Sequence, residues 1–289
     1  MKNKLKISYI FILPWIVGLL VFKLYPFAQS IIFSFTDYNF ITDSKFVGFN
    51  NYKMIFTKDK FFFDSLISTF KFVIISVPLK LIFALFVAMI LNKKIKGVNL
   101  FRTIFYIPSI LAGSVAVAAL WKFVFSNEGL VNSFLANIGV QGVSWMGSPN
   151  TSIFTLALLP VWQFGSSMII FLAGLKNIPE SLYEAAEIDG AGVIKKFFNI
   201  TVPMLSPVIF FNLIMQIIVA FQDFTGALLI TKGEPMRSTY VYGMYLYEMA
   251  FKNFKMGYAS ALAWILFVII LIFSVLIFGT SKKWVHYNE

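Results

Sequence analysis

The sequence predicts an all-α membrane protein with about six transmembrane helices. Hydrophobic residues make up 59% of the 289 residues and charged residues only 13%, whereas an average soluble domain is about 45–50% apolar and about 25% charged. Apolar runs also recur that can cross about 30 Å of hydrocarbon, which takes about 20 helical residues. The whole chain, residues 1–289, is therefore expected to form one transmembrane domain.

The apolar runs predict six spans in order along the chain. They cover residues 10–33, 66–91, 103–125, 152–175, 205–228 and 260–279. The first run follows Lys2, Lys4 and Lys6, as the apolar part of a signal peptide would. It continues past Tyr25 and Pro26 without a small-residue cleavage site, so an uncleaved helix that can kink at the proline is expected.

The distribution of basic residues orients these spans. Six spans place both termini on one side, together with the connections between spans two and three and between spans four and five. That side carries twelve Lys and Arg: Lys2, Lys4, Lys6, Lys93, Lys94, Lys96, Arg102, Lys176, Lys195, Lys196, Lys282 and Lys283. The opposite loops carry nine over a longer stretch of chain. The positive-inside rule therefore places both termini, and the polar segment 177–203, in the cytoplasm.

The loops expected on the other side, about 37–65, 126–151 and 229–259, are rich in Gly, Asn, Ser and aromatic residues. Such loops suit short interfacial helices or the docking of a partner, and aromatic belts at the lipid headgroups fit nearly as well.

Composition excludes several kinds of chemistry. The chain has no cysteine and one histidine, His286, so thiolate, histidine-metal and triad chemistry are not expected. No acid/base pair converges, so no catalytic residue, metal site or enzymatic activity is predicted. The phosphate-binding pattern G-x-x-x-x-G-K-S/T is absent, so ATP and its Mg²⁺ would have to bind another polypeptide. The basic residues behind the net charge of +11 are scattered among apolar spans, which argues against a nucleic-acid partner.

Segment 177–203 predicts a helix-turn-helix. Ser181 and Glu184 have the spacing of a capping box, and Asp189-Gly190-Ala191-Gly192 would break the helix because two glycines permit a tight turn. A second helix would then lead to Pro203, which suits the start of the next span. From local physics alone, a well-capped surface loop is as good an interpretation as a docking element.

The segment also resembles a known motif. Tyr183-Glu184-Ala185-Ala186-Glu187-Ile188-Asp189-Gly190-Ala191, followed by Phe197, Ile200, Pro203 and Pro207, is similar to the EAA loop of the membrane subunits of bacterial binding-protein-dependent ABC importers. The variant is similar to the carbohydrate branch, close to permeases for maltose, lactose and glycerol-3-phosphate. Residues 46–52, 101–108, 173–179 and 257–261 also resemble recurring stretches of that family, in its order, so the resemblance covers nearly the whole chain.

The resemblance implies a multi-pass permease in the cytoplasmic (inner) membrane of a bacterium that carries a sugar by alternating access. It implies four kinds of partner besides lipid: a second homologous permease subunit, two ATPase subunits that bind ATP and Mg²⁺, an extracellular or periplasmic solute-binding protein, and the sugar. It also implies that an ATPase contacts Tyr183, Glu184, Ala185, Ala186, Asp189, Gly190 and Ala191.

Polar residues in the fourth and fifth spans are candidates for the substrate path. At 100° per residue, Asn212, Gln216 and Asp223 share one helical face, with Ala220 on the neighbouring strip. The fourth span contributes Trp162, Gln163, Ser166 and Ser167, and aromatic faces beside amides and hydroxyls suit a sugar. The resemblance likewise implies sugar contacts on the helices that flank the EAA loop. For each residue, a helix-helix hydrogen bond is the alternative.

Two questions stay open at the level of sequence. Lys80, deep in the second span, could snorkel, pair with an acid or line the path. An ion-coupled secondary transporter or a channel without ATPase subunits is the alternative function. It would be expected to have inverted repeats around broken helices and gives the helix-turn-helix no role.

Overall fold

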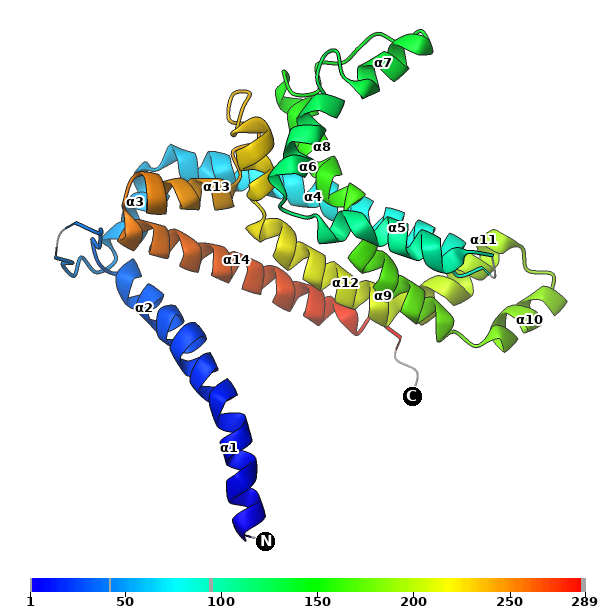
Figure 1. Cartoon of the computed structure of the whole chain (residues 1–289), viewed down its shortest axis with the longest axis horizontal. Helices are drawn as coiled ribbons and strands as arrows, with labels where there is room; N and C mark the ends of the chain where they lie inside the picture. Colours follow the sequence, from blue (N-terminus) through cyan, green and yellow to red (C-terminus); the bar gives the residue numbers. More distant parts are fainter. Residues whose placement is uncertain (1, 42, 94–95, 287–289) are drawn as a thin grey trace. The chain divides into compact units, whose positions relative to one another are not determined.

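The computed structural model describes residues 2–41, 43–93 and 96–286. The regular secondary structure of this part of the chain is helical, apart from one isolated antiparallel bridge between Thr36 and Phe46 (Figure 1). Four helices are long and apolar enough to cross a membrane: Phe11–Ser34, Lys60–Leu91, Val193–Thr231 and Met256–Ser281. Two bent helix pairs bring the candidate spans to six if each pair counts as one. The predicted all-α membrane class is therefore confirmed.

Residues 103–125 and 152–175, each predicted as one span, are each bent between two helices. Helix α5 (Val98–Ile110) meets α6 (Val115–Val124) at 100°, and α8 (Pro149–Trp162) meets α9 (Gly165–Lys176) at 50°. Pro108 and Pro160 each remove a backbone donor near the end of the first helix of the pair. At the first break, Gly113 has φ +77°, which a glycine adopts without strain.

The predicted fifth span, 205–228, is also interrupted. Helix α12 (Val202–Gln222) ends where Asp223 turns extended, with ψ 127°. Helical backbone resumes at Thr225 and leads into the π-helical turn η3 (Ala227–Thr231). Three consecutive predicted spans thus contain a break.

The described residues form two compact units, of which the first comprises residues 2–62 and 245–268. It contains α1 (Lys2–Leu19), the π-helical turn η1 (Leu20–Leu24) that precedes Pro26, and α2 (Tyr25–Ser34). It also holds α3 (Asn50–Lys58), η4 (Glu248–Lys252), the start of α4 (Lys60–Leu91) and the first half of α14 (Met256–Ser281). Buried Asn51 closes the end of α2, because its Nδ2 donates to the carbonyls of Ser34 and Thr36, each at 2.9 Å.

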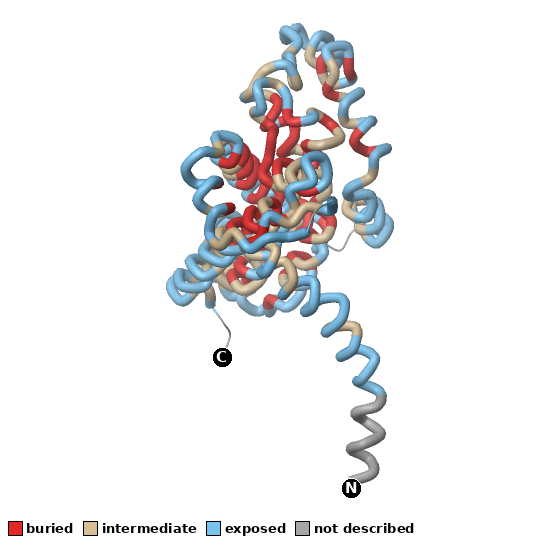
Figure 2. Tube along the Cα trace, turned by 90° about the vertical axis from the view of Figure 1, so that its left-hand side faces the viewer, coloured by how far each residue is buried: buried red, intermediate tan, exposed pale blue. Residues whose placement is uncertain are grey.

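The segment Phe11–Ser34 carries apolar side chains on its surface. None of its most apolar 18-residue window is buried, and Phe11 and Phe22 are 80% and 78% exposed. Figure 2 shows this helix mostly in pale blue beyond the grey residues. A soluble protein rarely exposes such a continuous apolar surface, so the segment fits contact with lipid or a partner. Lys94 and the side chains of Lys2, Lys4 and Lys6, which contributed to the orientation argument, lie outside the described residues.

The second unit comprises residues 63–244 and 269–286. Its core joins α4, α12 and the end of α14, where the Phe70 ring lies 5.4 Å from Phe221 and 5.6 Å from Phe273. Helix α9 packs on α12 at Gly174, where a Cβ would come within 2.8 Å of the Leu205 and Val208 side chains. Two of the loops predicted to hold short helices contain α7 (Leu130–Asn137) and α13 (Tyr242–Tyr247).

Candidate functional site

The polar segment 177–203 forms α10 (Glu180–Ile188), α11 (Val193–Lys196) and the π-helical turn η2 (Phe197–Thr201), which leads into α12. The chain reverses at Gly190, whose φ is +71°. Two contacts hold the segment together: Lys196 Nζ lies 2.6 Å from Glu187 Oε1, and the hydroxyls of Tyr183 and Thr201 are 2.9 Å apart. The hydrogen bond and the positive charge of Lys196 lower the pKa of Glu187.

The predicted capping box at Ser181 is wrong. Helix α10 begins at Glu180, one residue earlier, with Pro179 as its N-cap and no side-chain cap bond. Proline fixes φ near the helical value, so the helix can begin directly after it. The carbonyl of Pro179 then accepts the amide of Leu182 at 3.2 Å.

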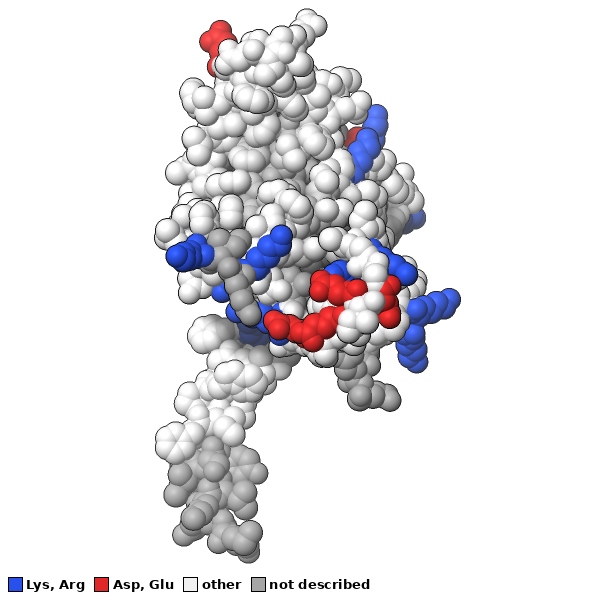
Figure 3. All heavy atoms as spheres, turned by 90° about the vertical axis from the view of Figure 1, so that its right-hand side faces the viewer, with Lys and Arg blue, Asp and Glu red and all other residues white. Residues whose placement is uncertain are grey.

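This segment presents both acidic and apolar groups to its surroundings. Of the residues assigned to coupling, Glu184, Ala185, Asp189 and Gly190 are exposed, and Tyr183, Ala186 and Ala191 are half-buried. Figure 3 shows acidic side chains gathered on the side of the molecule where α10 lies. Next to them Ile188, Val193 and Ile194 are 88%, 79% and 76% exposed. Large apolar groups this exposed in a polar segment are typical of a docking surface.

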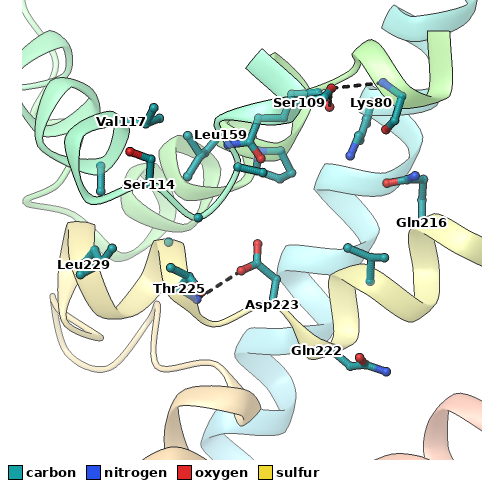
Figure 4. Close-up of a pocket in the computed structure, with 18 residues that line it drawn as sticks. Lys80, Ser109, Ser114, Val117, Leu159, Gln216, Gln222, Asp223, Thr225 and Leu229 are labelled. Carbon is teal, nitrogen blue, oxygen red and sulfur yellow. Dashed lines mark hydrogen bonds between the residues drawn. The ribbon is translucent and has the colours of Figure 1, made fainter. Parts of the chain in front are cut away.

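A cavity of about 440 Å³ lies in the second unit, where the three interrupted spans come together (Figure 4). Its wall includes residues from each break, namely Gly113, Gln163 and Asp223, and Lys80 from α4. Non-helical backbone is tolerated at membrane depth only where it is buried in protein or lines a water-filled space. The cavity therefore explains how the backbone can leave the helical conformation at these three places.

Ser109 ties two of these breaks together. Its Oγ donates to the Gln163 carbonyl at 3.0 Å and accepts the Ser166 amide at 3.1 Å. The approach of α5 and α9 is close at Gly165, where a Cβ would lie 2.6 Å from the Phe105 carbonyl oxygen. This part of the wall therefore depends on a serine hydroxyl and on a residue without a side chain.

The cavity presents hydrogen-bonding groups that the chain itself does not use. Within the described residues, the carboxamides of Gln163 and Gln216 form no hydrogen bond with another side chain or backbone group. Asp223 accepts the Thr225 amide at 3.2 Å, and Figure 4 shows its carboxylate and the Gln216 carboxamide directed into the cavity. A carboxamide both donates and accepts, so this wall can pair the hydroxyls of a polar solute.

The structure places five of the eight predicted path residues at this cavity or beside it. Gln163, Ser166, Gln216 and Asp223 line it, and Ala220 lines a pocket of about 20 Å³ that shares Lys80, Gln216 and Asp223 with it. The expected helical face for Asp223 is wrong, because α12 ends at Gln222. Asp223 reaches the cavity from the break.

The other three predicted residues do not line the cavity. Trp162 packs beside Trp121, with ring centroids 6.1 Å apart. Ser167 and Asn212 are fully buried, and in the described part of the chain neither side chain has a hydrogen-bond partner. A helical periodicity identifies a shared face, but it does not indicate whether that face meets a cavity or another helix.

Sequence reasoning missed several lining residues and left one undecided. Ser109, Ser114 and Thr225 line the cavity. The sequence signal for these residues was the break itself. Pro108 lies near the end of α5, Gly113 lies between α5 and α6, and Gln222-Asp223 is a polar pair in an apolar run. Of the three possibilities for Lys80, the structure favours the last, since its side chain lines the cavity.

The fold and the cavity define a class: a multi-pass helical membrane protein with a polar cavity at broken spans and a polar helical segment, residues 177–203, between two of them. The chain belongs to the family described as binding-protein-dependent transport system inner membrane components, whose pattern matches residues 54–282.

Named relatives agree with this assignment. A probable ABC transporter permease of Bacillus subtilis (strain 168), YesP, is 50% identical over 98% of this chain and 92% of its own. A probable starch degradation products transport system permease, AmyD of Thermoanaerobacterium thermosulfurigenes, is 32% identical over 95% and 94%. A chain in the crystal structure of a bacterial alginate ABC transporter, in complex with an alginate-pentasaccharide-bound periplasmic protein, superimposes with a TM-score of 0.83 at 22% identity, covering 97% of this chain and 96% of that one. The predicted resemblance to ABC permeases of the carbohydrate branch is confirmed.

Proposed function

We propose that the chain is the permease subunit of an ATP-driven ABC importer for a carbohydrate, and that the cavity at the helix breaks is part of the sugar's path. The observation that carries this proposal is the pair of carboxamides on the cavity wall, which have no hydrogen-bond partner among the described residues, together with the Asp223 carboxylate. In hydrocarbon such groups are costly, and they are typical of a substrate pathway. The names of relatives, which include permeases for starch products and for trehalose and maltose, support a sugar as the solute.

The partners proposed for this chain are those that membership of the family implies. In the proposed complex, this chain and a second homologous permease form the path, two ATPase subunits bind ATP and Mg²⁺ in the cytoplasm, and an extracellular or periplasmic solute-binding protein delivers the sugar. The complex lies in the cytoplasmic membrane of a bacterium with both termini of this chain inside. The basic residues of the sequence support that orientation.

The segment α10–α11 is the proposed contact with an ATPase. It combines exposed acids with exposed apolar side chains. Its two internal contacts join α10 to α11 and to η2, and η2 continues into α12, which lines the cavity. If an ATPase displaced this segment, the displacement would be transmitted to the cavity wall, because α11, η2 and α12 form one continuous helical element. This arrangement supports coupling by alternating access, with the segment as a rigid lever.

Broken helices alone do not separate this function from an ion-coupled transporter, which also uses them. Family membership and the docking segment favour the ATP-driven importer. The test is to purify this chain from cells that express its neighbouring transport proteins. A stoichiometric ATPase partner and sugar uptake that requires ATP would support the proposal. Uptake driven by a proton or sodium gradient without an ATPase would overturn it.

Coupling is tested at Gly190, whose Cβ position is open within 4 Å. Gly190→Asn and Gly190→Arg both impose the left-handed φ on a side chain, but asparagine tolerates it and is small. We expect Gly190→Arg to insert normally and lose ATPase coupling, and Gly190→Asn to keep most of it. Full uptake by the arginine variant at normal expression would show that the segment does not dock an ATPase.

A further inference from the structure

A second pocket, of about 520 Å³, lies entirely within the first compact unit. Its wall is formed by two segments far apart in the sequence, residues 37–61 and 245–258. Both segments belong to loops that the basic residues of the sequence place on the side opposite the termini. None of the described residues lines both this pocket and the cavity at the helix breaks, so the two are separate spaces.

One carboxylate ties the walls of this pocket together. Asp59 Oδ2 accepts the hydroxyls of Tyr245 in α13 and Tyr258 in α14. Its Oδ1 accepts the Phe62 amide at 3.1 Å in the first turn of α4. The Asp59 carboxylate is therefore satisfied by the protein, and it holds these walls in place without a ligand.

Other polar groups of the wall have no partner in the protein. Asn51 is only 7% exposed, and both hydrogen bonds of its side chain are donated by Nδ2, so within the described residues its Oδ1 is an unpaired acceptor. In the same part of the chain, the Tyr38 hydroxyl and the ammonium groups of Lys58 and Lys255 form no hydrogen bond or ion pair. Leaving a buried acceptor unpaired is costly, so a ligand hydroxyl that donates to Asn51 is favoured.

The wall also has apolar surface and no net charge. Phe61 and Met54 are 42% and 40% exposed and line the pocket beside the polar groups. Among the described lining residues, the two aspartates, Asp37 and Asp59, balance the two lysines. A charged ligand would therefore leave its charge uncompensated. A neutral wall with donors, acceptors and an aromatic ring suits a neutral solute with many hydroxyls and apolar C–H faces.

We infer that this pocket is a second carbohydrate site, on the outer side of the chain, and that it binds a neutral oligosaccharide independently of the cavity. The inference rests on the proposed function for the class of solute and adds a site to it. The hydroxyls of one sugar can donate to Asn51 Oδ1 and accept from the lysine ammonium groups, while its C–H faces cover Phe61 and Met54.

The experiment uses the assembled importer in proteoliposomes without its binding protein. The probes are maltotriose and galactotriose that each carry a photoreactive diazirine, and mass spectrometry maps the labelled residues with and without excess unlabelled sugar. Met54→Trp fills the pocket with a larger side chain. Lys53→Trp is the matched control, because Lys53 is exposed on the same helix and is not among the described residues that line the pocket. Tyr38→Phe removes a single hydroxyl. Assembled importer is quantified for each variant.

We expect labelling of the two segments that form the wall, and we expect unlabelled sugar to compete with it. Met54→Trp should abolish this labelling, and Lys53→Trp should leave it unchanged. Tyr38→Phe should raise the half-saturating concentration of the probe roughly 3- to 10-fold, because one hydrogen bond is lost. Gln216→Leu, which alters the cavity, should leave the labelling of this pocket unchanged.

Absence of competable labelling in the pocket, or equal labelling of Met54→Trp, would overturn the inference. The proposed function would still stand if the same vesicles took up sugar with ATP once the binding protein was added. If Met54→Trp weakened the affinity of the binding protein while no sugar labelled the pocket, the inference would be wrong and the pocket would be a seat for that protein. Absence of ATP-dependent uptake of every sugar would contradict the proposed function itself.

Discussion

Replacing Gly165 with alanine should separate α5 from α9 at the cavity wall. The added Cβ would lie 2.6 Å from the Phe105 carbonyl oxygen and 2.7 Å from the Tyr106 Cα, both backbone atoms that cannot rotate away. It would also lie 2.9 Å from Ser109 Oγ, the atom that holds the two breaks together. Relief requires a shift of one helix as a whole.

The expected loss in the free energy of unfolding has two parts. Overpacking a well-filled contact costs about 1–3 kcal/mol, and the two hydrogen bonds of Ser109 contribute about 1 kcal/mol each. We therefore expect Gly165→Ala to lower the free energy of unfolding by about 3–5 kcal/mol. Ser109→Ala, which removes the hydroxyl without adding bulk, should lose only about 2 kcal/mol. Because the two residues share one contact, the double variant should lose less than the sum.

The assay is thermal unfolding of the assembled complex in detergent, followed by size-exclusion chromatography. Gly279→Ala is the matched control, because within the described residues nothing beyond its own helix backbone and chain neighbours lies within 4 Å of its Cβ position in α14, and alanine favours a helix. We expect Gly279→Ala to unfold at or above the wild-type temperature. If Gly165→Ala were as stable as Gly279→Ala, the close approach of α5 and α9 would be wrong.

Other predictions concern the remaining polar contacts. Asn51→Ala should cost about 2 kcal/mol, because two backbone carbonyls lose their donor, whereas exposed Asn50→Ala should be nearly neutral in the same unfolding assay. Asn132→Ala should speed hydrogen exchange in its loop, where its side chain bonds the Val143 amide and carbonyl at 3.0 and 2.9 Å; protection equal to wild type would contradict this. The Glu187 pKa is lowered, so its ion pair with Lys196 stabilises α10–α11 at neutral pH and is lost as acid takes the pH below the ordinary glutamate pKa. Hydrogen exchange of α11, compared with Glu187→Gln at each pH, should differ at pH 7 and converge in acid, and a difference that persists in acid would refute the ion pair's role.

The sequence was sufficient for the fold class and for the polar segment, because both depend on local composition. Long apolar runs predict spans wherever they fall, and the two glycines after Ile188 predict a turn there. The helix breaks were not predicted, since Pro108 and Pro160 are compatible with kinked continuous helices as well as with broken ones. Which polar side chains meet the cavity depends on those breaks, and this is why Asn212 was placed on the path while Ser109 was not.

The most direct test of the central claim is sugar uptake by proteoliposomes that contain the assembled, ATP-loaded importer with its binding protein. Gln216→Leu removes a cavity carboxamide. Met215→Leu changes the neighbouring residue, which is 42% exposed and is not among the described residues that line the cavity. The two variants are compared at equal amounts of assembled complex. If the sugar passes through the cavity, Gln216→Leu should lose roughly 10- to 100-fold in apparent sugar affinity and Met215→Leu should lose none. Equal uptake by both variants would show that the wall at α12 is helix packing and that the sugar crosses elsewhere.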